Sequence, residues 1–211
     1  MPDMNPSSSI RPLRLAVLIS GGGRTLLNLH QHILDGSLHA RIDIVISSRR
    51  DAQGLERAKQ QNLPTIVVDR TSLPPDAFQD ALTAAVDSVD LVCMAGFLSL
   101  WRIPDTFTGR VINIHPALLP DFGGKGMYGL HVHEAVLNSG ARESGCTVHV
   151  CDNVYDHGPI LLQRRVPVLP GDTPMSLAAR VFAEECIAYP DAVNLLASRR
   201  IGSDHSDHET G

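Results

Sequence analysis

Two polar side chains stand two residues apart in the segment Val-Ile-Asn-Ile-His-Pro. Residues two apart on a strand project to the same face, so Asn113 and His115 could share one site. The following prolines end the strand, which puts both side chains at its carboxyl end, where ligands dock in open α/β sheets. Asp156, in a turn between two late strands, could reach the same edge. We expect its carboxylate to orient His115, raise its pKa and hold an imidazolium near neutral pH.

A glycine-rich segment, Ser-Gly-Gly-Gly-Arg-Thr at residues 20–25, lies where the first expected strand meets the first expected helix. Backbone N–H groups and the helix dipole converge on such a position, and glycine lets the backbone approach a phosphoryl oxygen closely. Arg24 can add charge and Thr25 a hydroxyl. A tight turn without a ligand is the alternative.

This segment is not a dinucleotide fingerprint. G-x-G-x-x-G would require glycine in place of Leu26, and no ribose-binding acid follows the second strand. We expect a ligand of mononucleotide size. A second glycine cluster at 123–126 lacks the residues of a phosphate loop and is interpreted as a mobile loop.

Apolar periodicity predicts the elements that position these residues. Strands are expected at 13–19, 42–46, 65–68, 91–94, 111–114, 146–150 and 160–168, and helices at 26–34, 52–61, 76–86, 131–137 and 172–196. Regular alternation through the first half predicts a mostly parallel, twisted sheet with helices on both faces. The closely spaced late strands depart from that rhythm. The expected fold class is therefore α/β.

Length and charge limit the classes of function. A chain of 211 residues can bury one sizeable core, so we expect a single domain at 11–201 with flexible tails at 1–10 and 202–211. A net charge of -5 argues against nucleic acid as a partner. Four cysteines without a C-x-x-C pair suit a reducing compartment, and the apolar run at 13–19 is too short to span a membrane. We expect a cytoplasmic protein.

Two histidine and cysteine spacings raise the possibility of a metal site. The first is Cys146, His149 and Cys151, and the second is the pair His131 and His133. On a strand, Cys146 and His149 face opposite sides, and the two residues of the second pair diverge on a helix. We therefore expect no metal, and interpret His149 as a supporting residue near Asp156.

Several segments together resemble one known family. They are I-S-G-G-G at 19–23, G-L-E-R-A at 54–58, A-G-F at 95–97, N-I-H-P-A-L-L-P at 113–120, Y-D-H-G-P-I at 155–160 and A-Y-P at 188–190. From about residue 13 to 190 the chain resembles the phosphoribosylglycinamide formyltransferases. The resemblance implies a Rossmann-like formyltransferase fold with antiparallel strands late in the chain.

The resemblance also implies a reaction. Formyl would pass from 10-formyltetrahydrofolate, as co-substrate, to the amine of glycinamide ribonucleotide, a step of purine biosynthesis that yields tetrahydrofolate. The partners would be these two small molecules, and the protein a monomer or homodimer. Asn113 and protonated His115 would stabilise the oxyanion, and Asp156 would hold His115 and relay protons through water.

Binding roles follow from the same resemblance. Gly22, Gly23, Arg24 and Thr25 would hold the ribosyl phosphate, and Glu185 the ribose or glycinamide part. The pterin pocket would be lined by Phe97, Leu98, Ser99, Leu100, Trp101, Asn153, Val154 and Tyr155. Without the resemblance, the apolar residues among them could equally belong to the core.

The chain departs from the family pattern in three places. Arg24-Thr25 replaces the usual Ser-Asn at the end of the glycine-rich segment. The arginine expected near the folate glutamate is replaced around residues 74–76, where Arg70 or Arg102 could substitute. The stretch 122–129 is longer than usual, and its glycines suggest a flap over the site.

Three other functions compete with the transferase. Formyltetrahydrofolate hydrolase would use the same three polar residues with water as acceptor, and methionyl-tRNA formyltransferase would need a basic RNA-binding domain. A non-catalytic phosphate-ligand sensor would keep the glycine-rich segment without needing Asn113, His115 and Asp156 together.

Overall fold

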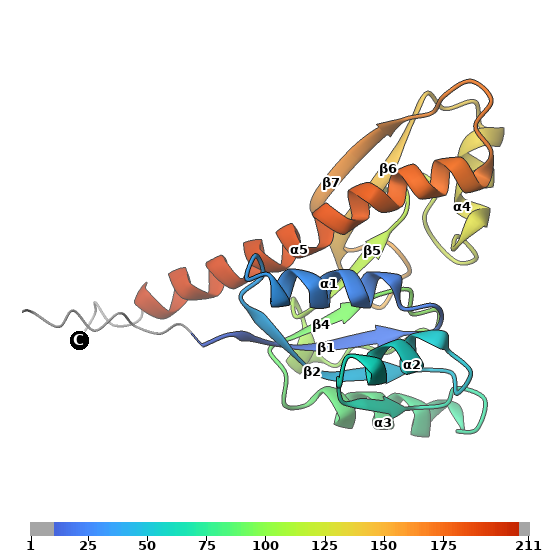
Figure 1. Ribbon diagram of the computed structural model, residues 1–211. Coiled ribbons are helices and arrows are strands. Elements are labelled where there is room, and N and C mark those ends of the chain that lie inside the picture. Colours follow the sequence, from blue (N-terminus) through green and yellow to red (C-terminus); the bar gives the residue numbers. More distant parts are fainter. Residues whose placement is uncertain (1–10, 207–211) are drawn as a thin grey trace, which may run out of the picture.

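A seven-stranded sheet forms the centre of the computed structural model, which describes residues 11–206, with side chains as far as residue 198 (Figure 1). The strand order is β3-β2-β1-β4-β5-β6-β7. The first five strands run parallel, and β6 and β7 are antiparallel to their neighbours. The strands are β1 (Leu13–Ile19), β2 (Ala40–Ser47), β3 (Thr65–Val67), β4 (Leu91–Met94), β5 (Val111–His115), β6 (Glu143–Val150) and β7 (Ile160–Pro167). The predicted fold class is confirmed.

Helices cover both faces of this sheet (Figure 1). They are α1 (Arg24–Leu34), α2 (Gln53–Gln60), α3 (Pro75–Val86), α4 (Leu130–Asn138) and α5 (Pro174–Ser206), with a 3-10 turn, η1, at Asp105–Phe107. Alternate residues of β1 enter two separate cores. Leu15 and Val17 belong to the core that includes residues of α1, α4 and α5, whereas Ala16 and Leu18 belong to the core that includes residues of α3 and Trp101. A strand buried on both faces explains the unbroken apolar run in the sequence.

The strand order reverses beside β1, because β2 and β3 lie on one side of it and β4 and β5 on the other. In open α/β sheets ligands bind outside the carboxyl ends of the strands at such a switch point. The segments that follow β1, β4 and β5 therefore carry the candidate site.

The long helix α5 contains Pro190, which cannot donate to the carbonyl of Cys186 four residues earlier. Asn28 of α1 satisfies that carbonyl instead, with Nδ2 donating across 2.8 Å. One residue before the proline, the Tyr189 hydroxyl lies within hydrogen-bonding distance of the Met94 and Ile112 carbonyls, at 2.9 and 3.1 Å. These contacts fix α5 to α1, β4 and β5.

Element boundaries differ from the sequence prediction mainly at the ends. β6 begins at Glu143 rather than Cys146, and α1 begins at Arg24 rather than Leu26. α5 continues to Ser206, so residues 202–206, predicted as the start of a tail, are helical. Residues 1–10 and 207–211, predicted as tail, lie outside the described residues. Within the described part of the chain, no helix is long and apolar enough to cross a membrane.

We predict that Asn28→Ala destabilises the protein by about 1–2 kcal/mol, because it leaves the Cys186 carbonyl without a donor. In a Pro190→Ala background the helix can supply the missing N–H, so the same substitution should cost less than half as much. Urea denaturation of the unchanged protein, the two single variants and the double variant measures the free energies of unfolding that are compared. Asn194→Ala is the matched control, since that side chain donates to the exposed Ser37 carbonyl and should cost under about 0.5 kcal/mol. Equal costs of Asn28→Ala in both backgrounds would contradict the account.

Candidate active site

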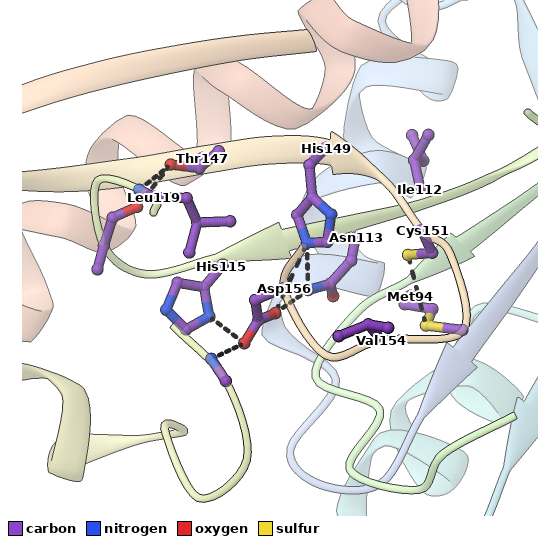
Figure 2. Close-up of polar contacts among 12 residues, drawn as sticks. Met94, Ile112, Asn113, His115, Leu119, Thr147, His149, Cys151, Val154 and Asp156 are labelled. Carbon is purple, nitrogen blue, oxygen red and sulfur yellow. Dashed lines mark hydrogen bonds and ion pairs between the residues drawn. The ribbon is translucent and has the colours of Figure 1, made fainter. Parts of the chain in front are cut away.

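Four polar side chains meet at the carboxyl end of β5 (Figure 2). Asn113 and His115 come from β5, and His149 lies opposite Asn113 in the antiparallel register of β6. Asp156, from the β6–β7 connection, reaches all three. Its Oδ2 lies 3.5 Å from His115 Nδ1, and its Oδ1 lies 3.6 Å from His149 Nε2 and 3.4 Å from Asn113 Nδ2. The three residues predicted to act together are thus brought together, with His149 beside them.

The loop after β5 holds this cluster in place. Gly124 N–H donates to Asp156 Oδ2 across 2.9 Å, and Asp156 has a positive φ of 53°. The Phe122 carbonyl accepts from His115 Nε2 across 2.8 Å. A carbonyl can only accept, so Nε2 carries a hydrogen and Nδ1 faces the carboxylate. Whether the stretch 122–129 also moves as a flap stays a prediction.

The pKa of His115 differs from the sequence prediction. We expect the Asp156 carboxylate to raise it, but His115 is 3% exposed, and burial lowers the pKa below the usual value for histidine. This effect outweighs the carboxylate and the Phe122 carbonyl, which both act in the opposite direction. The prediction of an imidazolium near neutral pH is therefore wrong. The prediction considered the charged neighbour and omitted the burial.

Asp156 shows the opposite balance. Burial raises its pKa, but the contacts with His149, His115 and the Gly124 N–H outweigh that effect and leave the pKa below the usual value. The carboxylate is therefore ionised at neutral pH. A fixed anion beside a buried imidazole and a carboxamide can hold a substrate amine and accept its proton.

A cavity of about 470 Å³ opens beside the cluster. Its lining includes Asn113, His115, His149 and Asp156, together with Thr25 and Glu185. Of the residues predicted to line a pterin pocket, the cavity is lined by Phe97, Leu98, Ser99, Leu100, Trp101, Val154 and Tyr155. The exception is Asn153, whose side chain pairs with the backbone of Ile103 at 2.8 and 3.4 Å.

Trp101 combines two roles that the sequence left as alternatives. It lines the cavity and is also 1% exposed, with its Nε1–H donating to Thr83 and its ring against Phe107. The cavity lining and the core of the α3 face are thus continuous at this residue.

Sequence reasoning missed part of the cavity lining. Met127 and Tyr128 line it, as does Lys125, which is the only lysine or arginine that lines it among residues 11–198. These three residues lie in a loop without apolar periodicity, so the only sign in the sequence that they belong to the site is the group of glycines around them. The two arginines considered as partners of the folate glutamate lie elsewhere: Arg102 pairs with Asp76 at 2.5 Å, and Arg70 lies 5.5 Å from the Phe78 ring centroid. Neither lines the cavity.

The glycine-rich segment leads into α1 as predicted. Gly23 caps the helix with a positive φ of 71°, and no side chain caps the N-terminus. Thr25 lines the cavity. Gly22, Gly23 and Arg24, which were predicted with it, do not line the cavity and come directly before Thr25 in the chain. The Arg24 guanidinium lies over the ring of Phe182, 3.6 Å from its centroid. The segment therefore offers backbone N–H groups to an anion next to the cavity.

Glu185 of α5 also lines the cavity. Burial raises its pKa to about 7, an effect that the positive charge of Arg24 partly opposes. A carboxyl group that is partly protonated at neutral pH can both donate and accept hydrogen bonds, which suits hydroxyl and amide groups of a ligand.

The histidines and cysteines that were considered as metal ligands do not form a ligand set. Among residues 11–198, no three histidine, cysteine or acidic side chains are grouped as a metal site would require. All four cysteines are free thiols.

We predict that Glu185→Gln stabilises the protein more at pH 8.5 than at pH 5. Because the pKa rises on folding from 4.5 to about 7, stability is lost as pH rises through that window, and glutamine removes the loss. The melting-temperature gain over the unchanged protein should be about 5 °C larger at the higher pH. Glu56→Gln is the control, because Glu56 is an exposed residue of α2. Its effect on the melting temperature should be the same at both pH values. A Glu185→Gln gain independent of pH would contradict the raised pKa.

Comparisons with known proteins agree with this geometry. A family described as formyl transferase matches residues 13–193. A chloroplastic phosphoribosylglycinamide formyltransferase of Arabidopsis thaliana is 40% identical over 199 residues, which are 90% of this chain and 68% of the relative. A similar protein of Vigna unguiculata is 40% identical over 92% of this chain and 64% of its own length. The chain thus spans about two thirds of these relatives.

Solved structures give the same result. A glycinamide ribonucleotide transformylase from Symbiobacterium toebii superimposes with a TM-score of 0.82 at 40% identity, covering 90% of both chains. A phosphoribosylglycinamide formyltransferase from Coxiella burnetii gives a TM-score of 0.80 at 37% identity, covering 90% of this chain and 89% of the other.

Proposed function

Because the chain belongs to the formyl transferase family, we propose that it transfers formyl from 10-formyltetrahydrofolate to the amine of glycinamide ribonucleotide. The products are formylglycinamide ribonucleotide and tetrahydrofolate, in purine biosynthesis. One observation carries the proposal: Asn113, His115 and Asp156 meet at a cavity that Thr25 and Glu185 also line. An amine anchored through its phosphate would then lie within reach of the reacting carbonyl.

The proposed chemistry follows from the donors and acceptors of the cluster. The substrate amine attacks the formyl carbon, and the carbonyl oxygen becomes an oxyanion stabilised by the Asn113 amide and by His115. The new C–N bond forms and the bond to the folate nitrogen breaks. The ionised Asp156 takes the amine proton, directly or through a water, and returns it to the leaving nitrogen.

His115 changes its charge during this reaction. Burial disfavours the imidazolium in the free site, but negative charge developing on the substrate oxygen opposes that effect. As the oxyanion forms, His115 therefore takes up a proton from solvent water, and it releases that proton when the oxyanion collapses. The imidazolium stabilises the transition state more than the ground state.

Binding roles are proposed on the same basis. The backbone of Gly22 and Gly23, with Arg24 and Thr25, holds the ribosyl phosphate, and Glu185 holds the ribose or glycinamide part. Residues 97–101 with Val154 and Tyr155 hold the pterin. Asn153 has a different role: it secures the shape of the pocket wall through its contacts with Ile103.

We also propose that residues 11–201 form the catalytic domain and that it acts without a metal, because hydrogen-bond donors and a carboxylate suffice for this reaction. The free thiols suit the reducing cytoplasm. The protein would act as a monomer or homodimer on small molecules alone.

An absorbance assay of folate product tests the proposed reaction. With 10-formyltetrahydrofolate present, product should form only when glycinamide ribonucleotide is added. Equal formation without the acceptor would identify a hydrolase. Binding of both ligands without any product would identify a non-catalytic sensor.

We predict that Asn113→Ala, His115→Ala and Asp156→Ala each lower kcat by about a hundred to a thousand-fold or more, because each removes a donor or the carboxylate that positions one. Circular dichroism should show that the fold is kept. The control His157→Ala removes a 71% exposed side chain from the same loop as Asp156 and should leave kcat within about twofold. Near-normal turnover in any of the three variants would remove that residue from the mechanism.

A further inference from the structure

The start of α2 packs directly on the glycine-rich segment at residues 21–23, here called the cradle. Gly54 N–H donates to the Gly21 carbonyl across 2.9 Å. A Cβ atom on Gly23 would lie 2.7 Å from Gly54 Cα, and a Cβ on Gly54 would lie 2.6 Å from Ile19 Cδ1 and 3.0 Å from the Gly21 carbonyl oxygen. Only glycine at both positions allows the two backbones this close approach.

One turn further along α2, Arg57 contacts the middle of the cradle. Its Nη1 donates to the Gly22 carbonyl across 2.7 Å, and the residue is half-buried. Neighbouring arginines are neutralised, Arg49 by Asp51 and Arg50 by Asp69. Arg57 forms no such ion pair with any side chain in the described range, so its positive charge beside the cradle remains available to an anion.

The contact with Arg57 also fixes the direction of a donor. A trans peptide is planar, so the Gly22 carbonyl and the following Gly23 N–H point in opposite directions. Holding the carbonyl toward α2 therefore turns the Gly23 N–H away from α2. The guanidinium of Arg24, the residue after the cradle, lies over the Phe182 ring and does not contact the Gly22 carbonyl.

We infer that Arg57, with Gly54 setting its helix against the cradle, is a positioning residue that gives the site its preference for a phosphorylated acceptor. It holds the Gly22–Gly23 peptide in the orientation that binds a phosphate oxygen, and its charge attracts the dianion. The inference rests on the proposed function, because it names what sets the specificity of the same site.

The kinetic test compares two acceptors, glycinamide ribonucleotide and the same molecule without its phosphate. For Arg57→Ala we expect KM for the phosphorylated acceptor to rise about tenfold or more, with kcat within about twofold. KM for the dephosphorylated acceptor should not change, so the preference for phosphate falls by the same factor. Arg57→Lys keeps the charge but loses the planar fork, and should recover part of the preference.

Lys59→Ala is the matched control, since it removes the same charge from an exposed position on the same helix. It should behave as the unchanged protein. Gly54→Ala should reduce the phosphate preference as Arg57→Ala does, if circular dichroism shows that it folds. If it does not fold, Arg57→Ala and Arg57→Lys decide the question.

A binding measurement separates this inference from the proposed reaction. Ribose 5-phosphate should raise the melting temperature of the unchanged protein and of Lys59→Ala, and the rise should be lost in Arg57→Ala. This outcome would support the role of Arg57 even if no formyl transfer were detected. The inference is overturned if Arg57→Ala keeps the phosphate-dependent rise, or if it weakens both acceptors equally, as a merely structural defect would.

Discussion

A largely buried, ionised carboxylate is the constraint around which the site is built. Asp156 lies within 3.6 Å of His115, His149 and Asn113, and the Gly124 N–H donates to its Oδ2. Removing such a group from water is costly unless several donors surround it. The chain supplies them from β5, β6 and the loop between β5 and α4. The contacts with Asp156 also bring the His115 imidazole and the Asn113 carboxamide to one place, and the Phe122 carbonyl holds the imidazole from its other side.

The sheet provides the rigid frame for that arrangement. β5 is parallel to β4 on one side and antiparallel to β6 on the other, so it lies where the two sheet patterns join. Tyr189 ties α5 to β4 and β5 through two carbonyls, and Asn28 supplies the hydrogen bond that Pro190 cannot make. The helix that carries Glu185 is thereby held in place against β5.

The cradle depends on two helices besides its own. α5 brings Phe182 under the Arg24 guanidinium, and α2 brings Gly54 and Arg57 against the glycine backbone. Glycines have more backbone freedom than other residues, because they lack a side chain that would restrict them. Packing from both neighbours limits that freedom, so the segment would lose less conformational entropy on binding the proposed phosphate.

The sequence by itself determined the alternation of elements, the positions of Asn113 and His115 on one strand face, and the glycine turn after β1, because these depend on local periodicity. Only the tertiary structure decided which residues these side chains contact. Three contacts join residues far apart in the chain: Asn153 with Ile103, Arg24 with Phe182, and Arg57 with Gly22. The pKa of His115 likewise depends on its burial in the folded chain. Such contacts and their burial arise from the packing of whole elements, which no local pattern encodes.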